Sequence, residues 1–299
     1  MSSRRDVTFI IVSYNSDKTL EASINSCLAS VQKYYANTGA VVVYDNASSD
    51  NCPQIIDNFA NKYPSIFIGI KSTENIGFGR ANNKAVQLSP SKTYFLINPD
   101  VVFEPEIVNT LTATLNSAND IAIVCPKLLY LDKSIQPSIR KFPSFTYFLL
   151  RNLLGERLQQ RFYPFKYYYD IAPTLDSAVE VNWAIGAFMV VSQDYVDRYG
   201  LFDERFFLYF EDVSLCVDAW LNGFRVIFQP QVHALHMYQR VSTSSKFNYM
   251  KLLHTVSALR FFAKYRPYKK RWQLLTHLLE LNLSLKSPFR FLLLTRRWS

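Results

Sequence analysis

The feature that most constrains the fold is a regular alternation of apolar runs and helix-patterned segments over the first 125 residues. Runs rich in β-branched and aromatic residues predict buried strands at 7–13, 40–44, 66–70, 94–97 and 121–125. Between these runs, apolar residues at helical spacing predict helices at 17–35, 52–63, 78–88 and 104–117. This alternation predicts an α/β fold with right-handed βαβ units, in which helices flank a mainly parallel sheet.

Polar residues directly follow two of the predicted strands. Asp45 and Asn46 come after the strand at 40–44, and Asn98-Pro99-Asp100 follows the strand at 94–97. Because ligands of such sheets bind at the carboxyl ends of strands, we expect both groups on one functional edge. Each group alone also suits an ordinary turn, and Asp50 suits a helix cap.

A glycine-containing segment, Asn75-Ile76-Gly77-Phe78-Gly79, precedes the predicted helix at 78–88. Glycines at this position allow backbone amides to approach a phosphate. The segment is not a Walker loop, because no Gly-Lys-Ser/Thr follows it. A plain loop-to-helix turn is an equally good interpretation of this segment alone.

The apolar run 206–210 leads directly into Glu211 and Asp212, within a segment at 206–220 that we predict to be helical. Unpaired carboxylates in apolar surroundings are costly. The pair is therefore either a helix end paired with a nearby arginine or a general base with a shifted pKa. Similarly, His236, after a predicted strand at 226–228, is either a metal or phosphate contact or a core histidine.

The cysteines, the first residues and the lengths of the apolar runs indicate the compartment of the protein. The four cysteines form no CxxC pair, which predicts buried free thiols and a reducing compartment. The first residues lack the pattern of a signal peptide, and no uncharged run approaches the length of a membrane span. We therefore expect a cytoplasmic protein.

The positive charge is concentrated at one end of the chain. Residues 240–299 contain 13 Lys and Arg and one acid, whereas the whole chain has a net charge of +9. From about residue 244 the pattern is helical, with aromatic residues and leucines beside the basic ones. This region is either an interfacial helix that binds anionic lipid or a basic helical subdomain that packs on the core. We do not expect nucleic-acid binding, because no nucleic-acid motif accompanies it.

Taken in order, these segments resemble the family 2 glycosyltransferases, which have the GT-A fold. The matching segments are 10–15, 44–50, 75–79 with Asn82-Asn83, 96–100, 183–188, 200–207, 208–212 and 230–236. The resemblance implies a GT-A catalytic domain at 1–240, followed by a basic amphipathic helical region at 241–299. Asn98-Pro99-Asp100, the segment 140–143 and the run 208–212 are most similar to bacterial rhamnosyltransferases that build O-antigen or related polysaccharides.

The resemblance implies an inverting, metal-dependent transfer of L-rhamnose from dTDP-L-rhamnose to a lipid-linked or polysaccharide acceptor, at the inner face of the plasma membrane. It implies that Asp212 is the general base and that Glu211 orients sugar hydroxyls. Asp100 and His236 would hold Mg²⁺ or Mn²⁺ on the diphosphate. The implied contacts to nucleotide or sugar are Ser13, Asn15, Asp45, Asn75, Gly77, Asn82, Trp183 and Gly186.

Several positions depart from the family pattern, and the motif at Asp100 lacks the first acid of the common Asp-x-Asp form. Ser214 stands where a second aspartate is common, Asp218 lies in the segment that usually holds an arginine, and Asn182 replaces a frequent aspartate. Other functions fit parts of the pattern, namely transfer of another UDP-, GDP- or dTDP-sugar and a non-catalytic sugar-nucleotide-binding scaffold. A sugar nucleotidyltransferase would need a glycine-rich turn after the first strand, which 13–16 does not provide.

Overall fold

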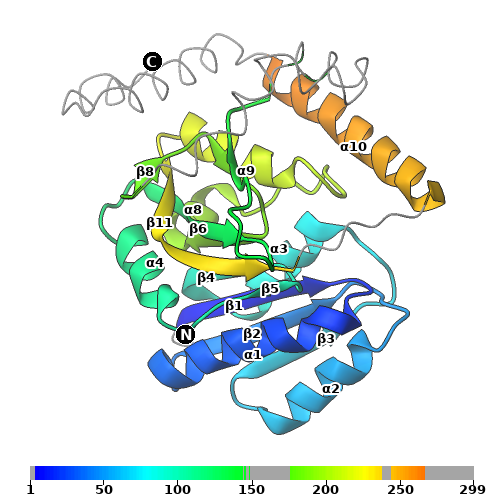
Figure 1. Ribbon diagram of the computed structural model, residues 1–299, viewed down its shortest axis with the longest axis vertical. Coiled ribbons are helices and arrows are strands. Elements are labelled where there is room, and N and C mark those ends of the chain that lie inside the picture. Colours follow the sequence, from blue (N-terminus) through cyan, green and yellow to red (C-terminus); the bar gives the residue numbers. More distant parts are fainter. Residues whose placement is uncertain (1–3, 144, 146–147, 149–175, 238–243, 267–299) are drawn as a thin grey trace.

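A central nine-stranded sheet organises the molecule (Figure 1). This computed structural model describes residues 4–143, 145, 148, 176–237 and 244–266. The order of the strands is β3-β2-β1-β4-β10-β6-β11-β5, and β8 pairs with β11 off this path. A separate two-stranded sheet joins β7 to β9. The predicted α/β architecture, with helices on a largely parallel sheet, is confirmed.

The first half of the sheet is the predicted parallel unit. Its strands are β1 (Arg5–Ser13), β2 (Gly39–Asp45), β3 (Phe67–Lys71) and β4 (Ser91–Ile97). The connecting helices are α1 (Asp17–Tyr34), α2 (Cys52–Lys62) and α3 (Phe78–Leu88). Every residue of β2 is buried, which explains why this strand is continuously apolar up to Asp45.

The second half mixes parallel and antiparallel pairing. Its strands are β5 (Val101–Val102), β6 (Ile121–Leu129), β7 (Ile139–Arg140), β8 (Val179–Glu180), β9 (Trp183–Ala184), β10 (Phe188–Ser192) and β11 (Arg225–His236). The helices are α4 (Ile107–Leu115), α8 (Gln193–Tyr199), α9 (Glu211–Leu221) and α10 (Ser244–Tyr265). β10 runs antiparallel to both β4 and β6, whereas β6 and β11 are parallel. β11 is longer than the predicted strand at 226–228, because it continues past a register shift between Gln229 and His233.

Two hydrophobic clusters lie on opposite faces of the sheet. Phe9 and Ile11 of β1 belong to one cluster, and Ile10 and Val12 belong to the other, as the alternation of side chains along a strand requires. The first cluster includes apolar residues of α1, α2 and α4, and the second includes those of α3, α8 and α9. Phe261 of α10 is fully buried in the second cluster, so this helix packs on the core.

The predicted helix at 206–220 is wrong at its start. α9 begins at Glu211, because Tyr209 and Phe210 both have left-handed backbone conformations, with φ of 68° and 67°. Non-glycine residues adopt this conformation at an energetic cost, so neighbouring groups must hold the turn in place. Phe206 and Phe210 are buried and anchor the turn, whereas Tyr209 is 37% exposed.

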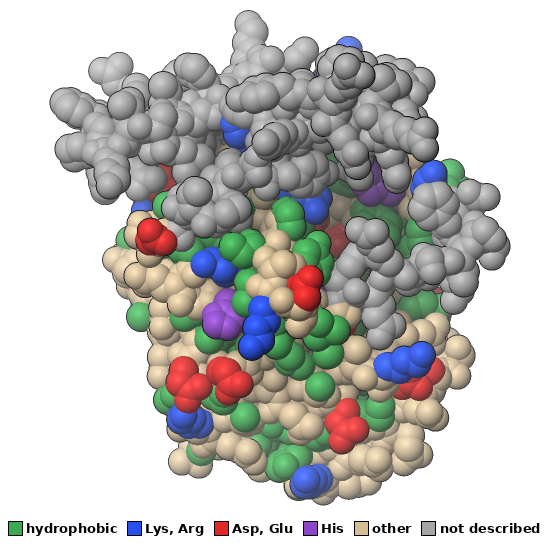
Figure 2. All heavy atoms as spheres, viewed as in Figure 1, with side chains coloured by type: hydrophobic (Ala, Val, Ile, Leu, Met, Phe, Trp, Pro, Cys, Tyr) green, Lys and Arg blue, Asp and Glu red, His purple; other side chains and the backbone are tan. Residues whose placement is uncertain are grey.

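The described surface carries charges of both signs. Figure 2 shows acidic and basic side chains interspersed on the described part of one face, without a patch of a single sign. All four cysteines are free and buried, as predicted. No helix among the described residues is both long and apolar enough to cross a membrane.

Candidate active site

Two adjoining cavities lie along the edge where the parallel strands end. The first, of about 730 Å³, is lined by residues that include Asn15, Asn46, Asn75, Gly77 and Asp100. The second, of about 650 Å³, is lined by residues that include Arg140, Trp183, Gly186, Glu211, Asp212 and His236. We call them the β1-side cavity and the α9-side cavity. Phe78, Asn98 and Leu208 line both, so the two cavities share a wall.

Asp45 braces the loop that follows β2. It is 1% exposed, and its carboxylate accepts hydrogen bonds from the Ser13 hydroxyl at 3.0 Å and the Ser48 amide at 3.1 Å. The neighbouring Asn46, rather than Asp45, lines the β1-side cavity. The structure therefore brings Ser13 and Asp45 together behind the cavity wall, and the contact of Asp45 with a base stays a prediction.

Side-chain amides shape the wall of the β1-side cavity. The Asn46 amide nitrogen donates to the Asn75 side-chain oxygen at 2.9 Å, and the Gly77 backbone amide donates to the same oxygen at 3.0 Å. Asn15, with a left-handed φ of 52°, accepts from the Ser49 amide at 2.8 Å. These bonds fix the loops that surround the space in which we expect the nucleotide.

Asn82 lies away from both cavities. It is 1% exposed, and its side-chain nitrogen donates to the Phe78 carbonyl at 3.0 Å within the first turn of α3. Asn82 was predicted to contact nucleotide or sugar, but in this structure it holds the start of α3 and lines neither of the two cavities.

Gly77 lets the loop before α3 approach the turn before α9. Its φ is 88°, and a Cβ at this position would lie 2.5 Å from the Phe207 carbonyl oxygen. The Phe78 amide donates to that same oxygen at 2.9 Å. Glycine is required here because the backbones approach closely and φ is positive. The sequence pattern indicated only a loop in which glycines allow amides to approach a phosphate.

Asp100, directly before β5, and His236, at the end of β11, come together because these two strands pair. The β5–β11 ladder sets His236 opposite Val101, and the His236 Nε2 atom lies 3.2 Å from the Asp100 Oδ1 atom. The His236 Nδ1 atom lies 2.9 Å from the Gln136 side-chain oxygen. Donation from Nδ1 to that oxygen, assigned from the partner, leaves Nε2 directed toward Asp100.

This pair fits a divalent cation that is shared with a ligand. Carboxylate oxygen and neutral imidazole nitrogen both bind Mn²⁺, and the carboxylate also suits Mg²⁺. Among the described residues, no group of three or more His, Cys, Asp and Glu side chains is arranged to hold a metal. Asp100 and His236 would therefore supply two donors, and diphosphate oxygens and water would supply the others. Gln136, which orients the histidine, carries no motif in the sequence.

Asp212 lies at the first turn of α9, facing Gly186. Its Oδ2 atom accepts from the Gly186 amide at 2.9 Å, and its Oδ1 atom accepts from its neighbour, the Val213 amide, at 2.8 Å. A Cβ at Gly186 would lie 3.2 Å from the Asp212 Cβ, so a side chain there would displace the carboxylate. Two predicted site residues are thus brought into direct contact.

Burial dominates the ionisation of the carboxylate pair. It raises the pKa of Asp212, and the amides of Gly186 and Val213 and the charge of Arg140 only partly offset this effect. Burial and the Asp212 charge raise the pKa of Glu211 well above its ordinary value. The Glu211 Oε2 atom has no hydrogen-bond partner in the described part of the chain. Asp212 therefore keeps the charge more readily than Glu211.

Trp183 and His254 form part of the wall of the α9-side cavity. The Trp183 indole nitrogen donates to the Lys141 carbonyl at 2.8 Å, and the Arg140 guanidinium lies 5.4 Å from the Trp183 ring centroid. His254, on α10, packs against Phe210 with ring centroids 5.3 Å apart. The sequence around His254 gives no local sign that α10 reaches this cavity.

These features define a class of protein. A sheet of this order, with adjoining cavities at its carboxyl edge, an aspartate–histidine pair and a buried carboxylate pair, is that of a glycosyltransferase with the GT-A fold. The chain belongs to glycosyl transferase family 2, whose family model matches residues 8–172. The expectation of a glycosyltransferase is therefore confirmed.

Two relatives extend this assignment toward rhamnosyltransferases. The chain is 28% identical to the rhamnosyltransferase WbbL of Escherichia coli over 276 residues, which cover 89% of this chain and 96% of that protein. It is 26% identical to the N-acetylglucosaminyl-diphospho-decaprenol L-rhamnosyltransferase of Mycobacterium tuberculosis over 220 residues, 70% of each chain. The predicted similarity to bacterial rhamnosyltransferases is confirmed.

Solved structures share the fold. The mannosyltransferase PcManGT from Pyrobaculum calidifontis, in complex with GDP-Man and Mn²⁺, matches with a TM-score of 0.60 and 18% identity. The match covers 95% of this chain and 71% of that one. GalNAc-T7 with UDP, GalNAc and Mn²⁺ also has a TM-score of 0.60, at 13% identity, over 81% of this chain and 45% of that one. This chain therefore spans less than half of GalNAc-T7.

The raised pKa of Glu211 predicts how stability changes with pH. A carboxyl group whose pKa is higher in the folded than in the unfolded protein stabilises the fold below its unfolded pKa. That contribution is lost as the pH rises through the folded value. Glutamine does not ionise, so we expect Glu211→Gln to remove this pH-dependent loss of folding stability. The variant should therefore become more stable relative to the wild type as the pH rises. Denaturant unfolding at several pH values tests this, with the exposed Glu204→Gln as control. Parallel pH profiles for the wild type and Glu211→Gln would contradict it.

Proposed function

We propose that this glycosyltransferase moves L-rhamnose from dTDP-L-rhamnose, with inversion, to a lipid-linked glycan acceptor in cell-surface polysaccharide synthesis. The observation that carries the proposal is the shared wall of the two cavities. Asp100 lies on one side of that wall, and Asp212 lies on the other. One bound nucleotide sugar can therefore place its diphosphate near Asp100 and its sugar near Asp212. The rhamnosyltransferase relatives support the choice of sugar.

Asp212 is the group that takes the proton from the acceptor hydroxyl. The Gly186 and Val213 amides hold its two oxygens in fixed directions, which leaves the remaining lone pairs for the acceptor. Its raised pKa makes it a stronger base than an exposed aspartate. Deprotonation by Asp212 makes the acceptor hydroxyl a stronger nucleophile toward the anomeric carbon. Glu211, buried beside it, provides a hydrogen-bonding group for sugar hydroxyls.

Asp100 and His236 would hold a divalent cation, which would neutralise charge on the departing diphosphate. Gln136 keeps the imidazole oriented toward Asp100. The residues that bind the leaving group and the residue that takes the proton are thus separate.

A transfer assay with matched variants tests the function. We expect turnover with dTDP-L-rhamnose, Mn²⁺ and a diphosphate-lipid acceptor, exceeding that with UDP- or GDP-sugars. Asp212→Asn should bind donor but lose at least about 10²-fold in kcat, whereas Asp194→Asn, on the surface of α8, should match the wild type.

His236→Gln should raise the Mn²⁺ concentration needed for half-maximal rate. Preference for another nucleotide sugar would refute the choice of donor, and near-normal turnover of Asp212→Asn would refute the base.

We also propose that the C-terminal region contacts the cytoplasmic face of the plasma membrane, where a lipid-linked acceptor lies. α10 exposes the large apolar side chains Tyr249, Leu252 and Leu259, and the exposed Lys251 and Arg260 are sequence neighbours of the two leucines. Such a combination suits an anionic lipid surface.

Liposome sedimentation tests this membrane contact. The double variant Leu252→Gln/Leu259→Gln should bind anionic liposomes about tenfold or more weakly than the wild type, because two apolar side chains no longer enter the lipid. Leu88→Gln, which changes an exposed leucine at the end of α3, is the matched control. Equal sedimentation of all three proteins would argue against a membrane surface on α10.

A further inference from the structure

The turn at 206–210, which leads into Glu211 and Asp212, packs against α10. Tyr209 and Phe210 are consecutive left-handed residues directly before Glu211, and such a conformation persists only where its surroundings impose it. Phe210 packs its ring on Phe261 of α10, with centroids 5.1 Å apart, and on His254 at 5.3 Å. The Ser257 hydroxyl of the same helix donates to the Leu208 carbonyl at 2.7 Å. Every residue from Leu208 to Phe210 therefore contacts α10, since Tyr209 also packs on His254.

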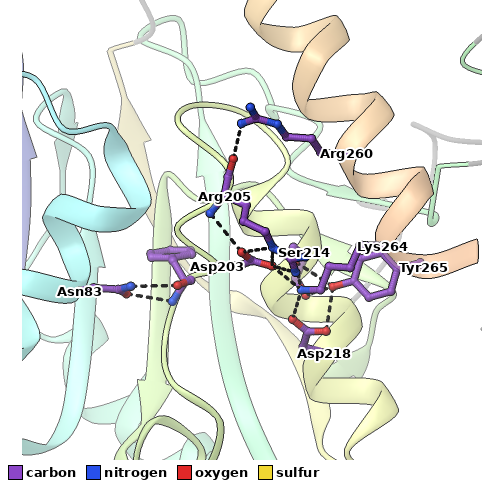
Figure 3. A network of polar contacts seen from close by, with 9 residues as sticks. Asn83, Asp203, Arg205, Ser214, Asp218, Arg260, Lys264 and Tyr265 are labelled. Atoms are coloured by element: carbon purple, nitrogen blue, oxygen red, sulfur yellow. Dashed lines mark hydrogen bonds and ion pairs between the residues drawn. The ribbon is translucent and has the colours of Figure 1, made fainter.

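A second set of contacts ties α10 to the body of α9. Figure 3 shows Lys264 and Tyr265 reaching from α10 to Ser214 and Asp218 of α9. The Lys264 ammonium lies 2.7 Å from Asp218, 2.9 Å from the Ser214 hydroxyl and 2.9 Å from Asp203. Its side chain is only 17% exposed, so this bridge is much less screened by water than the surface ion pairs.

The Tyr265 hydroxyl completes this cluster. It lies 2.8 Å from Asp218 and 2.8 Å from the Ser214 hydroxyl, and it donates to the Ser214 carbonyl at 3.1 Å. Ser214 and Asp218 are the two positions of α9 at which the sequence departs from the family pattern. In this chain their polar partners come from α10.

The same helix reaches both cavities. Tyr249, Met250 and Leu253 line the β1-side cavity beside Asp100, and His254 lines the α9-side cavity beside Asp212. A shift of α10 would therefore move the left-handed turn, α9 and part of both cavity walls together.

We propose that Lys264, Tyr265 and Ser257 of α10 are positioning residues for Asp212, acting through α9 and the turn at 206–210. This proposal rests on the role of Asp212 as base given under the proposed function. Lys264 and Tyr265 fix α9 from the side, and Ser257 fixes the turn from which α9 starts. None of the three touches the reacting atoms, so their loss should change the rate of transfer more than the binding of donor.

The experiment compares kcat with donor affinity in the full-length chain. Lys264→Met should lower kcat on the order of 10- to 100-fold, the effect expected when a catalytic group is misplaced by about 1 Å. Nucleotide-sugar affinity, measured by calorimetry, should stay near that of the wild type. Lys264→Arg, which keeps the charge, should recover most of the rate. Lys84→Met, which changes an exposed lysine of α3, is the matched control and should behave as the wild type.

Ser257→Ala gives a second test that leaves the charged cluster intact. It should show the same loss of kcat at unchanged donor affinity, but to a smaller extent. A lowered melting temperature with normal kcat in either variant would overturn the proposal, because the contacts would then be structural only. Equal losses of kcat and donor affinity would overturn it too. Asp212→Asn in the same assay separates the two claims: if it stays active, the base assignment itself fails, and if it alone is inactive, only the positioning role fails.

Discussion

The burial of two adjacent carboxylates at the first turn of α9 is the constraint on which the rest of the site depends. Charged groups are stable in such a position only when donors or charges compensate for lost water. The Gly186 and Val213 amides and the Arg140 charge provide this for Asp212, whereas the Glu211 carboxylate lacks a partner on one oxygen within the described residues. The left-handed residues before them add a cost on the order of 1–3 kcal/mol each.

Because the left-handed conformation of Tyr209 and Phe210 is costly, contacts from elements distant in sequence are needed to hold the turn at 206–210. Gly77 has no side chain where the Phe207 carbonyl passes, and Gly186 has none where Asp212 lies. α10, from the other end of the described chain, packs over Phe210. Asp100 and His236 also meet through a tertiary contact, since β5 and β11 are far apart in the sequence and pair in the sheet. Geometry at both ends of the site is therefore set by tertiary contacts.

The sequence predicted the parallel half of the fold well, because β-branched runs buried on both faces have a strong local signal. It did not predict the pairing of β10, since antiparallel insertion between β4 and β6 depends on contacts far along the chain. It placed the start of α9 too early, because apolar residues at 206–210 fit a helix until backbone conformation is known. The sequence predicted only 226–228 of β11, because Pro230 interrupts the run of strand-forming residues in that strand.

For the candidate site too, the sequence indicated several residues but not the long-range contacts between them. The residue pattern indicated Asp100, Asp212 and His236, and the resemblance added Gly186 and a shared metal for Asp100 and His236. The fold adds the contacts of Asp100 with His236 and of Asp212 with Gly186. It gave no sign of Gln136 or His254, which act through long-range contacts. Asp45 and Asn82 belong to the matching motifs yet line neither of the two cavities, because a motif gives the residue type but not the direction of its side chain.

The central claim is that Asp212 acts as a base on the acceptor and does not itself attack the sugar. The most direct measurement is the anomeric configuration of the first-formed product, determined by NMR with the donor that the enzyme uses. A single displacement by the acceptor hydroxyl predicts inversion relative to the donor. A product that retains the donor configuration would contradict the account.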